Sequence, residues 1–183
     1  MHLFSIWTIG PSAVGKTTVS KIFYNQLKIK NDKLILLDGD KIRNLYENNL
    51  GYDPISRSKN TFRYINLVKW LMEYKISSIV AVISPFEKDR DVCRKEIKNY
   101  KEIYLSCSLE ERIKRDKKKL YIIADKYFSG LPFEMLITTE RNITTENRKQ
   151  KGQEDFEPRY FVEGYNINYL PNVASFFNLK AST

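Results

Sequence analysis

The residues with the clearest chemical meaning form the segment Gly10-Pro11-Ser12-Ala13-Val14-Gly15-Lys16-Thr17, which has the spacing G-x-x-x-x-G-K-[ST]. In such a loop the glycines let successive backbone N–H groups turn toward a phosphate. We therefore expect all eight residues to form an ATP-binding loop, with Lys16 at the β- and γ-phosphates and the Thr17 hydroxyl as a ligand of Mg²⁺. A chance glycine turn is the alternative, but the loop follows an apolar, strand-like segment and precedes a helical one, as this motif requires.

Two carboxylates follow the next strand-like segment, in Leu37-Asp38-Gly39-Asp40. The single histidine is His2, near the terminus, so a carboxylate must accept any proton that leaves an alcohol. Asp38 is the first candidate for this base, and Asp40 could share the role or hold a water of the Mg²⁺ shell. Alternatively, both only cap a helix that begins near Lys41, because aspartate is a favoured N-cap residue.

Spaced arginines, rather than a cationic block, accompany these motifs, and the guanidinium fork suits phosphate oxygens. As a set on loops that follow strands, they predict a pocket for a doubly anionic substrate, although a surface salt bridge is the alternative for each one taken alone. The set consists of Arg43, Arg57, Arg63, Arg90 and Arg115.

The elements that must position these groups alternate along the chain. Apolar or β-branched segments predict strands at Leu3–Ile9, Lys33–Leu37, Ser78–Ile83, Glu102–Cys107 and Tyr165–Leu170. Helical periodicity predicts helices at Thr17–Lys28, Thr61–Tyr74, Lys88–Tyr100 and from Leu109 to about Ala124. This alternation favours a three-layer α/β fold of the P-loop kinase type, with about five parallel strands and helices on both faces. The loop and the two aspartates would then share the carboxyl edge of the sheet.

The stretch from Asp125 to about Tyr160 breaks the alternation, with Gly130, Pro132 and polar runs. Residues 112–151 contain 11 basic and 5 acidic residues, and so hold six of the nine net positive charges. Connections of this length are usually functional or disordered. We expect a mobile lid at about residues 112–160 that closes over a polyanionic ligand; a solvated, partly disordered face is the alternative.

The composition limits the class of protein. With 183 residues and 42% hydrophobic side chains, the chain fits a single domain over residues 1–183. Two cysteines, neither in a CxxC pair, and no leader or apolar run of about 18 residues predict a reducing, cytoplasmic location without membrane contact. The pI of about 9.4 indicates anionic partners. We expect no nucleic-acid binding, because acidic residues interrupt the basic cluster at residues 112–119 and no RNA-binding aromatic motif accompanies it. The sequence leaves the oligomeric state open and allows a homodimer.

Over roughly residues 5–124 the chain resembles adenylyl-sulfate kinase, a P-loop kinase that phosphorylates the 3′-hydroxyl of adenosine 5′-phosphosulfate. Besides the loop, the matching segments are Leu37–Arg43, Leu50-Gly51-Tyr52 with Arg57 and Asn60, Ile83–Phe86 with Asp89-Arg90-Asp91 and Arg94, and Arg115-Asp116 with Lys118 and Leu120-Tyr121. The resemblance implies that residues 10–17 bind ATP and that Asp38 and Asp40 serve the reacting hydroxyl and the metal.

The resemblance also implies a substrate site. Arg43, Arg57 and Asn60 would hold the phosphosulfate and the nucleotide, Tyr52 would replace a family phenylalanine near the adenine, and Ile83 and Ser84 would contact the substrate. Ser84 matches a serine that is assigned in some members as a phosphorylated intermediate; it could instead simply end the strand beneath the substrate, because direct transfer to an alcohol needs no covalent stop. Arg115 and Lys118 match lid positions over the nucleotide.

The chain departs from the family pattern after Tyr121. Where the family has a Lys-Gly-Phe-Thr-Gly segment and a Pro-Tyr-Glu turn around the adenylyl group, this chain has residues 122–133, in which Tyr127, Phe128 or Phe133 could supply a stacking ring. The resemblance thus predicts an ATP- and Mg²⁺-dependent kinase of adenylyl sulfate, an enzyme of sulfate assimilation. Two alternatives stay open. One is a kinase of the same fold for another nucleotide-linked anion, such as a cytidine diphosphate-linked phosphoramidate, and the other is a non-catalytic nucleotide-binding module.

Overall fold

All strands of the sheet run in the same direction. The computed structural model describes residues 3–117, 119 and 160–163, and in this part of the chain the strand order is β2-β3-β1-β4-β5. The strands are β1 (Ser5–Ile9), β2 (Leu34–Asp38), β3 (Ser77–Ala81), β4 (Tyr100–Ser106) and β5 (Tyr160–Glu163). β1 lies in the middle, with Ser5 beside Ser78 of β3 and beside Tyr100 of β4. The parallel sheet expected from the sequence is confirmed.

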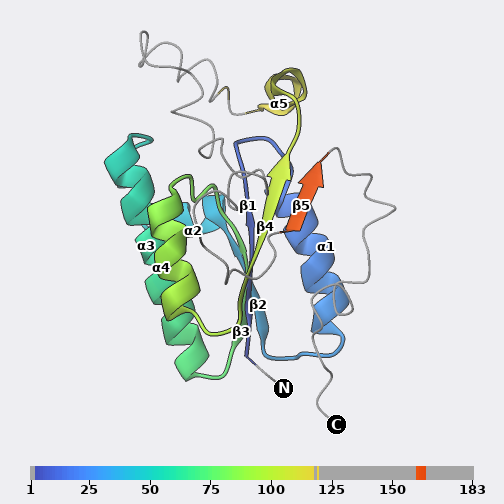
Figure 1. The fold of residues 1–183 in the computed structure, drawn as a ribbon, viewed down its shortest axis with the longest axis vertical. Coiled ribbons are helices and arrows are strands. Elements are labelled where there is room, and N and C mark those ends of the chain that lie inside the picture. Colours follow the sequence, from blue (N-terminus) through green and yellow to red (C-terminus); the bar gives the residue numbers. More distant parts are fainter. Residues whose placement is uncertain (1–2, 118, 120–159, 164–183) are drawn as a thin grey trace, which may run out of the picture.

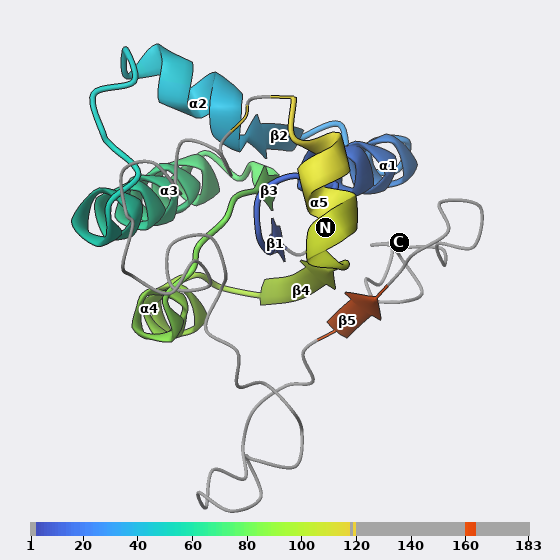
Figure 2. The same ribbon diagram turned by 90° about the horizontal axis from the view of Figure 1, so that it is seen from above.

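Helices cover both faces of this sheet (Figure 1). The helix α1 (Lys16–Lys28) lies on one face, and α3 (Pro54–Glu73) and α4 (Glu87–Glu96) lie side by side on the other. Two short helices complete the described part, α2 (Gly39–Leu45) after β2 and α5 (Leu109–Arg115) after β4. The view from above shows α2 near the end of β2 and α5 across the carboxyl end of the sheet (Figure 2). The predicted three-layer arrangement is therefore present.

Two apolar clusters fill the spaces between the layers, because alternate residues of a strand point to opposite faces. Ile6 and Ile79 pack with Val19, Phe23 and Leu27 of α1. On the other face Trp7 is buried with Tyr64 of α3 and Cys93 of α4. All five strand residues of β1 and of β3 are buried, as expected for strands covered on both faces.

Three helices differ from their predicted bounds. α3 begins at Pro54 rather than at Thr61, because Asp53 caps it by accepting a hydrogen bond from the Ser56 N–H at 2.9 Å. The added turns are mostly polar and none of their residues is buried, so they show no apolar periodicity. α4 ends at Glu96 rather than at Tyr100, since Asn99 takes a left-handed φ of 51° and Tyr100 already pairs with β1.

α5 ends at Arg115 rather than near Ala124. Residues 115–119 are four cations and one aspartate, which offer no apolar side chain for packing. The strand predicted at Tyr165–Leu170 lies outside the described residues, as does most of the lid expected at about 112–160; the fifth strand in the structure is β5. Among the described residues, no helix combines the length and the hydropathy that a bilayer crossing requires.

Candidate active site

The loop between β1 and α1 needs backbone conformations that glycine adopts easily. Gly10 and Gly15 have φ angles of 140° and 96°, and Ala13 has a φ of 60°. A Cβ on Gly10 would lie only 2.3 Å from the carbonyl oxygen of Leu105, so the loop turns directly against β4. Val14 is buried in the apolar cluster between the sheet and α1, so its side chain holds the loop against the core.

The start of α1 suits an anion. The helix begins at Lys16, directly after Gly15, and no side chain caps it. The partial positive charge of such a helix end attracts phosphate. The Lys16 ammonium donates to the Pro11 carbonyl oxygen at 2.6 Å, so the side chain folds back over the loop. The sequence Gly10–Thr17 thus has the local geometry of a phosphate-binding loop.

Thr17 and Asp38 lie at the junction of the loop and β2. The Thr17 hydroxyl donates to Asp38 Oδ2 at 2.6 Å, and Asp38 Oδ1 accepts from the N–H groups of Asp40 and Lys41 at 3.1 and 3.3 Å. The N-cap alternative for Asp38 is therefore correct for one carboxylate oxygen, while the other faces the loop. Because Asp38 is only 8% exposed, these contacts hold it in place.

Asp40 occupies the first turn of α2 and lines the cavity described below. Tyr64 supports this turn from α3 by donating its hydroxyl to the Gly39 carbonyl oxygen at 3.1 Å. Burial, and then the negative charges of Asp38 and Asp40, raise the pKa of Tyr64 well above its usual value, so it stays a neutral donor. A Cβ on Gly39 would lie 2.9 Å from the Ala81 carbonyl oxygen, which shows how closely α2 approaches the end of β3.

A cavity of about 400 Å³ opens at this edge of the sheet, within the range usual for ligand sites. It connects the phosphate loop with the ends of β2 and β3, the start of α3 and the end of α5. Its lining residues include Ser12, Ala13, Gly15, Lys16, Thr17, Asp40, Arg43, Tyr52, Arg57, Asn60, Ile83, Ser84 and Arg115. One continuous cavity therefore joins the residues predicted for the nucleotide to those predicted for the substrate.

Two arginines hold the aromatic residue at the far side of this cavity. The Arg43 and Arg57 guanidinium carbons lie 4.6 and 5.8 Å from the centre of the Tyr52 ring. Arg43 also donates to the Gly51 carbonyl oxygen at 2.7 Å, and Arg57 Nε donates to that of Tyr52 at 2.7 Å. These contacts fix the loop between α2 and α3 and leave the Tyr52 ring 44% exposed, so that a planar ligand could stack on it.

Two buried polar atoms on the cavity wall have no hydrogen-bond partner in the described part of the chain. They are the Ser84 hydroxyl oxygen and the side-chain oxygen of Asn60. Ser84 is 1% exposed and has a φ of 40°, which is unusual for a residue with a Cβ. An unsatisfied buried polar atom costs about 1–3 kcal/mol. Both atoms belong to residues that line the cavity but are themselves covered by their neighbours, so a polar ligand would reach them only when these side chains turn toward it.

The structure separates the predicted arginines into two groups. Arg43, Arg57 and Arg115 line the cavity, whereas Arg63 lies over the Tyr46 ring at 4.4 Å and Arg90 is fully buried beneath α4. The expectation that all five arginines face one pocket is wrong for Arg63 and Arg90. Arg63 contacts Tyr46, and Arg90 contacts Glu87 and Glu102 between α4 and β4.

Other predicted residues also need separate description. Gly10, Pro11, Val14 and Asp38 lie beside the cavity and do not line it, and Lys118 lies outside the described residues. The sequence reading did not assign Thr18, Thr61 or Lys117, which line the cavity. Isolated polar residues such as these do not mark a site in a sequence. Their neighbours Thr17, Asn60 and Arg115, which were predicted as site residues, gave the only indication.

The residues present fit a bound Mg²⁺. A threonine hydroxyl and a carboxylate in contact are hard oxygen donors, and Mg²⁺ commonly uses only one or two protein groups together with phosphates and water. In the described part of the chain no cluster of three or more metal-binding side chains is found, so a cage made by the protein alone is not present there.

Comparison with known proteins adds a family to this geometry. A family model described as adenylylsulphate kinase matches residues 2–133, a longer span than the resemblance seen in the sequence. The chain is 39% identical over 118 residues to a probable adenylyl-sulfate kinase of Archaeoglobus fulgidus, covering 64% of this chain and 76% of that protein. It is also 38% identical over 118 residues to the cytidine diphosphoramidate kinase of Campylobacter jejuni, covering 64% of this chain and 69% of that protein.

A solved structure agrees with the fold. The APS kinase of Mycobacterium tuberculosis in complex with AMPPNP and APS superposes with a TM-score of 0.69 at 22% identity and covers 90% of each chain.

Proposed function

This chain belongs to the adenylylsulphate kinase family and is a kinase, and from that premise we propose that it transfers the γ-phosphoryl group of ATP to the 3′-hydroxyl of adenylyl sulfate, releasing ADP. The observation that carries the proposal is the single cavity that joins the phosphate loop to the unsatisfied Ser84 and Asn60 atoms and to the Tyr52 ring. A phosphate donor and a planar, polar acceptor would fit its two ends. The described strands, β5 included, belong to one sheet, which supports a single kinase domain.

At the donor end, backbone N–H groups of the loop and Lys16 would bind the triphosphate. Lys16 would leave the Pro11 carbonyl oxygen, 2.6 Å away, for the phosphate oxygens. Thr17 and Asp38 would hold Mg²⁺, which when bound neutralises charge on the phosphates. Arg115 lies across the cavity, and its side chain is half exposed beside Glu111 at 3.1 Å, so it has room to turn toward the nucleotide.

At the acceptor end, the two aspartates divide their tasks. Both carboxylate oxygens of Asp38 accept hydrogen bonds, one from the backbone N–H groups of α2 and the other from the Thr17 hydroxyl. Asp40 lines the cavity, so it is better placed to accept the proton of the acceptor hydroxyl. This assignment revises the order of preference drawn from the sequence, in which Asp38 came first. Arg43 and Arg57 supply positive charge beside Tyr52, where an anionic nucleotide would stack.

A second acceptor class deserves a direct test, because a relative named for cytidine diphosphoramidate is about as similar to this chain as the adenylyl-sulfate kinases are. ADP release should be measured with adenylyl sulfate, AMP, cytidine diphosphoramidate, CDP and no acceptor. We expect strong turnover with adenylyl sulfate. Turnover with a cytidine compound alone would establish the second candidate, and no acceptor-stimulated turnover at all would contradict both.

The variants Asp40→Asn and Asp38→Asn test the division of tasks. Asp40→Asn should reduce acceptor-dependent turnover by about 10²–10⁴-fold, the usual contribution of a general base, while ATP still binds. Asp38→Asn keeps a good N-cap but loses the acceptor for Thr17, so we expect it to raise the Mg²⁺ concentration that the reaction needs. Equal effects of both variants on the Mg²⁺ dependence would contradict the assignment.

A further inference from the structure

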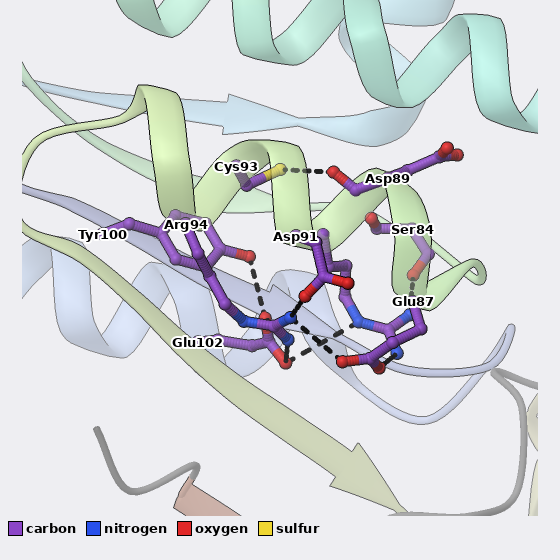
Figure 3. Close-up of polar contacts among 9 residues, drawn as sticks. Ser84, Glu87, Asp89, Asp91, Cys93, Arg94, Tyr100 and Glu102 are labelled. Carbon is purple, nitrogen blue, oxygen red and sulfur yellow. Dashed lines mark hydrogen bonds and ion pairs between the residues drawn. The ribbon is translucent and has the colours of Figure 1, made fainter. Parts of the chain in front are cut away.

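An ionic cluster lies between α4 and β4, next to the cavity wall and outside the site described above; Arg90 and Glu102 are buried in it, and its outer carboxylates are partly exposed. Two arginines and three carboxylates make it up, namely Arg90, Arg94, Glu87, Asp91 and Glu102. The labelled side chains of Glu87, Arg94 and Glu102 converge there (Figure 3). Buried ion pairs are often no more stabilising than apolar residues of the same size, so stability alone explains such a cluster poorly.

Arg90 links this cluster to the cavity. Its side chain is fully buried, and Nη1 donates to the Ser84 carbonyl oxygen at 2.8 Å. Nη2 donates to Glu87 Oε2, and Nε lies 3.7 Å from Glu102 Oε1. Glu87 of α4 and Glu102 of β4 thus hold the planar guanidinium, while its Nη1 contacts Ser84 of the cavity wall.

Ser84 is the residue that needs such support. It follows β3 in a segment that crosses the carboxyl edge of the sheet, and its φ of 40° is strained for a residue with a Cβ. Such a conformation persists only when its surroundings impose it. The hydrogen bond from Arg90 fixes the Ser84 carbonyl group, and so the peptide unit between Ser84 and Pro85 on the cavity wall.

Arg94 is a natural comparison. Its Nη2 contacts both Glu102 oxygens at 3.0 and 2.9 Å, and its Nη1 contacts Glu87 at 3.0 Å and Asp91. Burial lowers its pKa, but Glu102 and then Glu87 outweigh this and raise the pKa above the usual value, so the side chain stays charged. Arg94 therefore shares the carboxylates of Arg90, whereas no contact of Arg94 with Ser84 is found among the described residues.

We propose that Arg90 is a positioning residue for the acceptor half of the site: held by Glu87 and Glu102, it fixes Ser84 in its left-handed conformation and so fixes the cavity wall at residues 82–85. The inference rests on the proposed function, since it assigns this wall to the acceptor. The charge of Arg90 offsets part of the negative charge of the three carboxylates, and its planar guanidinium positions the wall. A lysine at this position would keep the positive charge but lose the planar guanidinium, whose N–H donors point in fixed directions.

The first experiment compares Arg90→Lys with Arg94→Lys. We expect Arg90→Lys to lower kcat/KM for the acceptor by about tenfold or more, because a displacement of about 1 Å at a reacting group can cost 10²-fold. The KM for ATP should stay within about twofold, since Arg90 does not line the cavity. Arg94→Lys should leave kcat/KM for the acceptor within about twofold. Equal losses in both variants, or a normal kcat/KM in Arg90→Lys, would overturn the proposal.

A second, milder pair covers the case in which Arg90→Lys does not fold. Glu87→Ala removes the carboxylate on Arg90 Nη2, and Asp91→Ala removes a carboxylate that contacts Arg94 instead. Both side chains are partly exposed, at 33% and 42%, and both lie on α4 and contact Arg94, so the two variants differ in the contact with Arg90, which of the pair Glu87 alone makes. Glu87→Ala should lower kcat/KM for the acceptor about threefold or more, and Asp91→Ala should not.

Backbone hydrogen exchange separates this proposal from the proposed function, because it needs no acceptor. Exchange in the peptide 82–86 should accelerate in Glu87→Ala and stay unchanged in Asp91→Ala. Unchanged exchange in Glu87→Ala would overturn the proposal, and so would faster exchange with normal acceptor kinetics. If the wild-type chain used no acceptor of the panel, the proposed function would fail while the exchange result still decided whether the cluster holds the wall.

Discussion

Replacing Gly10 with alanine should both destabilise the fold and weaken ATP binding. The new Cβ would lie 2.3 Å from the Leu105 carbonyl oxygen, and ordinary contact begins at 3.4 Å, so the loop or β4 must move by about 1.1 Å. Overpacking of this kind costs about 1–3 kcal/mol, and a positive φ on alanine adds about 1–3 kcal/mol. For a chain of this length, about 2–4 °C are lost per kcal/mol, which predicts a fall in Tm of at least about 4 °C.

The effect on ATP follows from the same displacement. Hydrogen bonds to a charged group contribute about 1.5–3 kcal/mol, so the loss of one loop N–H contact weakens binding about tenfold or more. Thermal unfolding measured with and without Mg·ATP gives both quantities, and titration calorimetry checks the Kd. Gly51→Ala is the comparison variant, because its Cβ would meet the Asp53 side chain at 2.9 Å and a backbone atom only at 4.0 Å, so it should disturb the α3 cap and not the phosphate loop. A Tm within about 2 °C of the wild type in Gly10→Ala, together with a Kd within twofold, would refute the reasoning.

Three further outcomes test separate parts of the structure. Burial, and then the charge of Glu102, raise the pKa of the Cys93 thiol from 9.0 to about 12. The contribution of Cys93 to stability is therefore complete below pH 9 and is lost as the pH rises toward 12. The difference in unfolding free energy between the wild type and Cys93→Ala should shrink from pH 8 to pH 10.5. Hydrogen bonds from Ser56 lower the pKa of Asp53 below 3.8, so the α3 cap stabilises the fold above that pH and fails in stronger acid; urea unfolding should show a smaller effect of Asp53→Ala at pH 2.5 than at pH 7. Tyr52→Leu removes the aromatic ring beside Arg43 and Arg57. It should raise the KM for the acceptor about threefold or more without changing the KM for ATP. An unchanged KM for the acceptor would show that no base stacks on Tyr52.

Local chemistry explains which parts of the fold were predictable. The loop at Gly10–Thr17 and the cap at Asp38 depend on glycine freedom and on short side chains beside their own backbone, so neighbouring residues contain the signal. The central strands were recognisable because both of their faces are covered, which makes them rich in apolar and β-branched residues. The start of α3 was missed since its first turns are mostly polar and contain no buried residue, and the end of α5 was missed because cationic residues continued the helical pattern without an apolar face.

The candidate site divides in the same way. Asp40, Arg43 and Arg57 were selected from the residues themselves, Tyr52 and Asn60 only by resemblance, and the fold brings all five to one cavity. By contrast, Arg63 and Arg90 belong to the same spaced set in the sequence, yet one lies on a tyrosine ring and the other in a buried ionic cluster. Both lie within helices, α3 and α4, rather than on the loops expected from the sequence, and spacing along the chain contains no information on which neighbour such a side chain will meet.

The sequence by itself determined the chemistry available here: a phosphate-binding loop, two carboxylates after the second strand and the alternation that builds a parallel sheet. Only the tertiary structure decided that Asp38 is occupied by Thr17 and α2 while Asp40 lines the cavity, and that Arg90 reaches Ser84 from beneath. The physical reason is range. Backbone conformation, capping and periodicity act over a few residues, whereas the environment of a side chain depends on contacts with elements far away in the sequence, and these form only when the layers pack together.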